Sequence, residues 1–203
     1  MPRIGTFRAG TAVATALFLC SCHAPDQELA GKPLSEWTLL LDSDDRHDRL
    51  AAVPAVGEMA RQHPDDAAAV RSLRAALKHD DRAVRHWAVR SVSTLGEAAA
   101  DFEGDLRDRL SDEISDVRIW AAYGLCRLGK TDEGLPVLAD ALSSTNGADR
   151  LHAAHALEAL GEDARPVAEA LRGVLGDEFG YPDRVATRFL KSLGEYPKSA
   201  AQD

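Results

Sequence analysis

One motif, which ends in leucine and glycine, occurs four times in this chain at nearly constant spacing. Its copies read RHWAVRSVSTLG, RIWAAYGLCRLG, RLHAAHALEALG and DRVATRFLKSLG. The final glycines, Gly96, Gly129, Gly161 and Gly194, follow one another at intervals of 33, 32 and 33 residues. A fixed period of this length is typical of solenoids, in which each repeat buries its apolar face only against its neighbours.

Each copy carries a helical pattern of apolar residues. An alanine stands eight positions before each glycine, an aliphatic residue four before it and a leucine one before it; the alanines are Ala88, Ala121, Ala153 and Ala186. These positions share one face of a helix, and the glycine stands where a C-cap belongs. DRLAAVPAVGEMA is a degenerate earlier copy, in which we expect Pro54 to kink the helix or to delay its start.

Less regular apolar stripes separate the copies, and they also have helical spacing. They begin at Leu34, Val70, Phe102, Leu135 and Val167. Turn-forming stretches such as SSTNGAD divide one pair of helices from the next. The composition agrees, because alanine, leucine, arginine and glutamate are strong helix formers. We therefore predict an all-α fold, an α-solenoid of about five helix pairs over residues 33–195, with a disordered tail at 196–203.

The letters that recur before the glycine point to one class of solenoid. An acid is followed by arginine and alanine, as in DDRAVRHWAVRSVSTLG and SDVRIWAAYGLCRLG. This pattern resembles HEAT repeats of the short, bacterial, phycobilisome-lyase-like kind, from Pro33 to about Glu195. The period is nearer that of tetratricopeptide or ankyrin repeats, but their signature letters are absent. The resemblance implies a right-handed superhelix, in which a column of arginines pairs with acids of adjacent repeats: Arg49, Arg85, Arg118 and Arg150.

The first segment, MPRIGTFRAGTAVATALFLCSC, has the parts of a secretory signal. Arg3 and Arg8 precede an apolar stretch that is too short to span a bilayer comfortably. The letters LCSC resemble the lipobox of bacterial lipoproteins, with Cys22 as the acylated residue; Cys20 fits less well because the large Leu19 precedes it. An ordinary signal peptide, cut near His23, is the alternative.

This reading predicts a lipoprotein signal peptide at residues 1–21 and a polar tether at 22–32. A diacylglyceryl thioether on Cys22, together with an amide-linked chain such as palmitate, would hold the protein to a membrane, because two or more acyl chains give stable anchoring. We therefore expect a membrane-anchored lipoprotein of the cell envelope, on the periplasmic or extracytoplasmic side.

Two further columns lie opposite the core stripe, nine and six positions before each glycine, and should line the concave side of the solenoid. Aromatic residues and arginine are enriched in binding hot spots. The candidate partner-binding residues are Trp87, Arg90, Trp120, Tyr123, His152, His155 and Arg188. We expect Tyr123 and Arg90 to be exposed, whereas the tryptophans could instead pack between helices.

Several kinds of chemistry have no support in the sequence. The G-x-S-x-G, P-loop and H-E-x-x-H motifs are absent, so we predict no catalytic residues and no cofactor. His152 and His155 have a spacing that can hold a metal, but no partner ligand is evident, and we predict no metal site. Cys126, flanked by leucines, should be an unreactive thiol. A net charge of −9 argues against nucleic acid as the partner.

The sequence therefore predicts a lipid-anchored module, not an enzyme, that binds a protein or peptide on its concave face. An enzyme or an accessory of an enzyme is the alternative, because lyase-like HEAT repeats accompany bilin attachment and similar repeats occur beside secreted hydrolases. A purely structural spacer is a third possibility.

Overall fold

The structure is a computed structural model that describes residues 27–168 and 181–194, with side chains omitted for residues 181–186. Two layers of helices run along the chain. The outer layer contains α1 (Leu34–Leu40), α3 (Ala67–Leu77), the 3₁₀ helix η1 (Gly96–Phe102) with α5 (Glu103–Arg109), α7 (Thr131–Leu142) and the 3₁₀ helix η2 (Gly161–Val167). The inner layer contains α2 (Arg46–Gln62), α4 (Arg82–Ser93), α6 (Ser115–Arg127), α8 (Gly147–Leu160) and α10 (Tyr181–Ser192).

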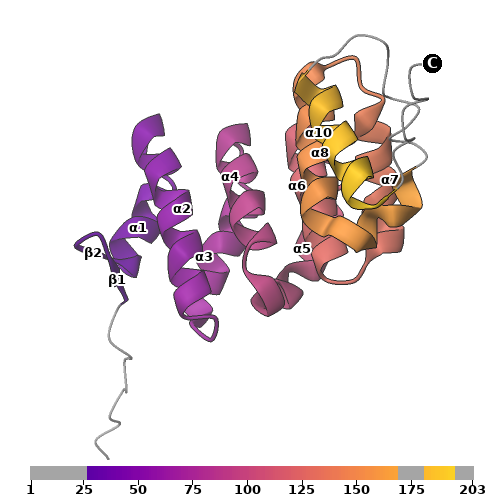
Figure 1. Cartoon of the computed structure of the whole chain (residues 1–203). Coiled ribbons are helices and arrows are strands. Elements are labelled where there is room, and N and C mark those ends of the chain that lie inside the picture. Colours follow the sequence, from indigo (N-terminus) through magenta and orange to yellow (C-terminus); the bar gives the residue numbers. More distant parts are fainter. Residues whose placement is uncertain (1–26, 169–180, 195–203) are drawn as a thin grey trace, which may run out of the picture.

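Helices of the inner layer pack each against the next, from α2 to α10 (Figure 1). The outer helices α1, α3, α5 and α7 each pack against the inner helix that follows, whereas η2 packs against α7 and α8. The outer helices have few contacts with one another. The predicted α-solenoid is therefore confirmed. Leu171 and Leu175, which we expected in the outer helix of the last pair, lie outside the described residues.

Small residues let the inner helices approach closely. Ala88, Ala121 and Ala153 are all fully buried. They belong to two hydrophobic clusters, one built mainly on α1 to α5 and the other on α6 to α10, with Trp120 and Leu110 packed against both. The column of alanines is thus the seam along which successive repeats join, as the sequence predicted.

Glycine ends these helices because it tolerates a left-handed backbone. Gly96, Gly129, Gly161 and Gly194 have φ angles of 66°, 78°, 60° and 70°, a region that costs an L side chain free energy. Gly134 in α7 serves a different purpose. A Cβ atom added there would lie 2.4 Å from both the Ala122 carbonyl oxygen and Cys126 Sγ, so glycine permits α7 to lie directly on α6.

The arginines of the column make one kind of contact that recurs and another that differs from repeat to repeat. In all four arginines of the column, Nη1 donates hydrogen bonds to two backbone carbonyls of the preceding turn, five and six residues back. Among the described residues, the expected pairing with an adjacent repeat occurs for Arg49, which contacts Asp81 at 2.8 Å, and for Arg85, which contacts Asp112 at 2.9 Å. Arg118 makes no such pair, because Asn146, which caps α8, is neutral where Asp81 caps α4.

Of the two expected effects of Pro54, a kink or a delayed helix start, the delayed start does not occur. Helix α2 begins at Arg46, behind the N-cap Asp45, and continues through the proline to Gln62. Pro54 lies on the exposed side of α2, where a helix tolerates its ring more readily than in the buried face.

The beginning of the described chain is also ordered. Strands β1 (Glu28–Leu29) and β2 (Lys32–Pro33) form a small antiparallel hairpin. Trp37 Nε1 of α1 donates a hydrogen bond to the Leu29 carbonyl at 3.0 Å. The last residues of the expected tether are therefore part of the folded unit. Within the described ranges no helix combines the length and the apolarity needed to cross a bilayer.

Candidate functional site

Arg90 on α4 is the centre of a cluster on the inner layer. Its guanidinium lies 5.1 Å from the ring centroid of Trp87, one turn earlier on the same helix, and 4.7 Å from that of Trp120 on α6. Residues three apart share a helix face, and the repeat places the tryptophan of the next copy on the opposite side of Arg90. The guanidinium therefore lies between two indole rings, each of which attracts it through its π electrons.

Trp120 and Tyr123 extend this cluster along α6. Their rings meet edge to face, with centroids 5.6 Å apart and an interplanar angle of 89°. Trp120 Nε1 is buried and has no hydrogen-bond partner among the described residues. We call these four residues, Trp87, Arg90, Trp120 and Tyr123, the arginine–tryptophan cluster.

The expectation that Tyr123 is exposed is wrong. Tyr123 is only 8% exposed and belongs to the core cluster that α6 forms with α7 and α8. The ring lies at the junction of two repeats, where the neighbouring helix and Trp120 cover it. Arg90 and Trp120 are half-buried, and Trp87 is 38% exposed, so only part of the cluster reaches solvent.

The charge environment of Arg90 differs from that of the arginines that form ion pairs. Within the described part of the chain no carboxylate lies within ion-pair distance of its guanidinium, and no protein acceptor receives its N–H groups. Arg188 on α10, six positions before its glycine like Arg90, instead forms an ion pair with Glu158. Of these two arginines, Arg90, which the tryptophans flank, is the one whose donors remain available.

The remaining residues of the expected stripe are engaged in polar contacts. His152 Nδ1 lies 2.6 Å from Asp116 Oδ1, and His155 Nδ1 lies 3.7 Å from Glu158 Oε2. The structure therefore divides the stripe into the arginine–tryptophan cluster and a second group, His152, His155 and Arg188, whose members all contact acids.

Asp116 is a residue of this surface that the sequence analysis did not identify. Its second oxygen lies 2.8 Å from Nδ1 of His86, so one carboxylate on α6 joins histidines of α4 and α8. Burial raises the pKa of Asp116, but the two imidazoles outweigh this effect, and the pKa lies below its ordinary value. Asp116 was recognisable only as an acid near a helix start; its partners are 30 and 36 residues away.

Cys126 lies beneath this surface and is 2% exposed. Burial, with a smaller effect of the Asp163 carboxylate, raises the pKa of its thiol to about 12. No group of three or more metal-binding side chains occurs among the described residues. Cys22, the expected lipidation site, lies outside them.

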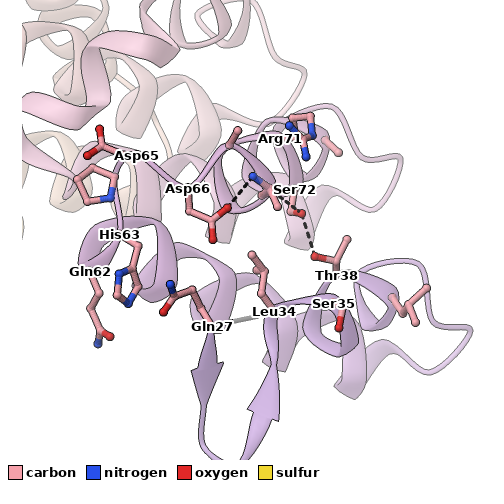
Figure 2. Close-up of a pocket in the computed structure, with 15 residues that line it drawn as sticks. Gln27, Leu34, Ser35, Thr38, Gln62, His63, Asp65, Asp66, Arg71 and Ser72 are labelled. Carbon is pink, nitrogen blue, oxygen red and sulfur yellow. Dashed lines mark hydrogen bonds between the residues drawn. The ribbon is translucent and has the colours of Figure 1, made fainter. Parts of the chain in front are cut away.

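A groove between α1 and α3 has a volume of about 1160 Å³ (Figure 2). We call it the N-terminal groove. Its walls are α1, the turn that follows α2, and α3, and Gln27 lies at its edge. It exists because α1 has 7 residues whereas α3 has 11, so the first outer helix covers its neighbour incompletely. Sequence reasoning missed it, since it depends on how two helices of unequal length lie together.

Comparisons with known proteins agree with this architecture. A family profile for HEAT repeats matches residues 104–198. A search of curated proteins finds no match. Among solved structures, an engineered protein is 22% identical, with a TM-score of 0.57 over 79% of this chain and 78% of its own.

Two other solved structures are similar. A designed armadillo repeat protein in complex with the peptide (KR)4 is 19% identical, with a TM-score of 0.55 over 78% of this chain and 81% of its own. The complex of CpcE and CpcF of phycocyanin lyase from Nostoc sp. is 15% identical, with a TM-score of 0.56 over 79% and 97%. At these identities the likeness concerns the fold alone. The profile match supports HEAT repeats in residues 104–198, and the solved structures support the same kind of solenoid for the fold.

Proposed function

We propose that this chain is a lipid-anchored binding module that holds a protein or peptide partner on its inner helix layer. The single observation that carries the proposal is the position of Arg90 between Trp87 and Trp120, without a carboxylate partner among the described residues. Of the residues expected to bind a partner, these three combine exposure, aromatic surface and an available charge.

The chemistry of this cluster favours a carboxylate. A guanidinium presents a planar set of N–H donors that matches a carboxylate in a bidentate geometry. The two indole rings hold Arg90 in place before a partner arrives, which lowers the conformational entropy lost on binding. An extended peptide segment with an Asp or Glu side chain, flanked by apolar residues, would suit this surface.

Similar folds give limited support. The designed armadillo repeat protein is in complex with a peptide of lysine and arginine, and CpcE is in complex with CpcF. Each of these similar folds thus occurs in a complex with another chain. The charge of the cluster here suggests a partner of the opposite sign to (KR)4. The enzyme alternative rests on likeness to the phycocyanin lyase structure, which concerns the fold.

Lipid anchoring remains part of the proposal and rests on the lipobox-like LCSC. Mass spectrometry of the N-terminus from native membranes tests it directly. An acylated Cys22 is expected, whereas an unmodified N-terminus at His23 or an intact Met1 would contradict it.

The binding surface is tested by capture in the cell envelope. Photo-crosslinking through a residue beside Trp87 should trap a partner, and the affinity of the purified pair can then be measured. Arg90→Gln keeps a polar side chain but shortens it and removes its charge, and it should weaken binding about tenfold or more, as expected for a hot spot.

Arg188→Gln is the matched control, because Arg188 occupies the same column and is already paired with Glu158. It should change affinity much less than Arg90→Gln. Both variants should retain the helical circular dichroism of the parent. Equal affinities for the parent and the Arg90 variant would refute the proposed surface.

A further inference from the structure

The N-terminal groove presents an apolar surface that the described residues leave uncovered. Leu34 and Leu39 of α1, Pro64 of the turn, and Ala68 and Ala75 of α3 contribute to its lining. Leu39 is 76% exposed, the most exposed of the large hydrophobic side chains described. An apolar recess of this size is the usual form of a binding site for an apolar ligand.

The polar groups of the groove are largely satisfied within the protein. Thr38 and Ser72 hydrogen-bond to each other at 2.9 Å, and Ser72 Oγ also lies 2.9 Å from the Ala68 carbonyl (Figure 2). Asp66 caps α3 by accepting a hydrogen bond from the Ala68 N–H at 2.8 Å. These groups need no polar ligand. Gln27, His63, Asp65 and Arg71 also line the groove, but most of the lining area is apolar, so burial of apolar area is the main interaction that the groove offers.

The N-terminal segment enters the fold at this groove. Gln27 lies at its edge, and the Gln27 carbonyl accepts a hydrogen bond from the Leu34 N–H at 2.7 Å. Cys22 precedes Gln27 by 5 residues, which can span at most about 17 Å. Whatever Cys22 carries therefore remains within reach of the groove.

We infer that the N-terminal groove receives an acyl chain carried by Cys22. The inference rests on the lipid anchor of the proposed function and goes further by assigning a site to one of its chains. The apolar lining provides the affinity, and the short connection provides a high effective concentration. The first helix pair is thereby held next to the lipid, at the opposite end of the described solenoid from α10.

An alkylated thiol tests the groove without relying on acylation by the cell. The chain that begins at Cys22 contains one other cysteine, Cys126, which is buried, so N-hexadecylmaleimide at neutral pH should modify Cys22 selectively. The same chain treated with N-ethylmaleimide carries the identical linkage without the long chain. Thermal unfolding and sedimentation of the two adducts are then compared.

The hexadecyl adduct should remain monomeric and should unfold at least about 4 °C higher than the ethyl adduct, because a ligand bound only to the folded state stabilises it. Ala75→Asp places a charge in the groove and should abolish this gain. Ala159→Asp is the matched control: Ala159 is an exposed alanine in the last turn of α8, away from the groove, and its variant should keep the gain.

Four results would overturn the inference. The first is that the two adducts have equal unfolding midpoints, and the second is that Ala75→Asp leaves the higher midpoint of the hexadecyl adduct intact. The third is that the ethyl adduct forms a dimer that Ala75→Asp abolishes. The fourth is that the higher midpoint is lost when phosphatidylcholine vesicles are added. The third would assign the groove to a second copy of the chain, and the fourth would place the acyl chain in the bilayer. Failure of the anchor itself would appear separately, in the mass of the native N-terminus.

Discussion

Replacing Arg85 by methionine would test whether ion pairs between repeats stabilise this solenoid. Arg85 and Asp112 are both buried, with relative exposures of 7% and 8%, and two hydrogen bonds of 2.9 and 3.2 Å join them. Methionine retains much of the apolar volume of the side chain, but it leaves the carboxylate of Asp112 without its main partner.

The size of the effect follows from comparison with Arg118. Removing one member of a buried ion pair costs about 3–5 kcal/mol of the free energy of unfolding. Arg109 also contacts Asp112, at 3.1 Å, which favours the lower end of that range. Arg118 donates the same two hydrogen bonds to backbone carbonyls but pairs with no acid among the described residues, so Arg118→Met should cost only about 1–2 kcal/mol.

The pH dependence provides a second measurement. Burial raises the pKa of Asp112, but hydrogen bonds from Arg85 and from the Ile114 N–H outweigh it, so the pKa in the folded state lies below its ordinary value. The unfolded chain then binds the proton at higher pH than the folded chain does. The pair therefore stabilises the fold at neutral pH, and its contribution is lost as the pH falls below about 4.

Urea unfolding followed by circular dichroism, at neutral pH and at several values down to pH 3, measures both effects. At neutral pH, Arg85→Met should lower the free energy of unfolding by about 2 kcal/mol more than Arg118→Met does. In acid, the loss of stability caused by Arg85→Met should become smaller. If the two variants lose the same free energy of unfolding, or if the loss caused by Arg85→Met does not depend on pH, the ion pair does not stabilise the fold as argued.

Three further predictions concern packing and reactivity. Gly134→Ala should destabilise the fold by about 1–3 kcal/mol, because the added Cβ would collide with α6. A Cβ added at Gly104 meets nothing within 4 Å, so Gly104→Ala should be neutral or should stabilise the fold by about 0.5–1 kcal/mol. Urea unfolding compares the two variants. Ala121→Leu should cost about 1–3 kcal/mol in the same assay, and an unchanged midpoint would contradict the tight seam between α4 and α6. Cys126 should resist maleimide at pH 8 in the folded protein and react fully in urea, since burial raises its pKa to about 12; rapid labelling of the folded chain would show that the core opens readily.

Periodic features of this protein could be predicted from sequence because they depend on residues close together in the chain. The glycines with positive φ and the buried alanines recur at fixed places, and each is required by the geometry of a helix end or of a helix contact. The same logic identified the column that contains Arg85, since its hydrogen bonds to the preceding turn repeat with the motif.

Contacts between repeats depended on single residues that the pattern does not fix. Arg85 finds an acid in the following turn, whereas Arg118 faces a turn whose helix cap is the neutral Asn146. Tyr123 and Arg90 share a column, yet the tyrosine is buried, because the residues around each position differ. A column therefore predicts which face a side chain shares, but not how much of it the neighbouring repeat covers.

The sequence by itself determined the class of fold, the register of its repeats and the residues that join them, because these follow from helical periodicity and local backbone geometry. Only the tertiary structure decided that Arg90 lies between two tryptophans, that Asp116 joins two histidines, and that α1 leaves a groove beside Gln27. Those features arise from side chains about one repeat apart and from helices of unequal length, whose distances are set by how the repeats stack in space.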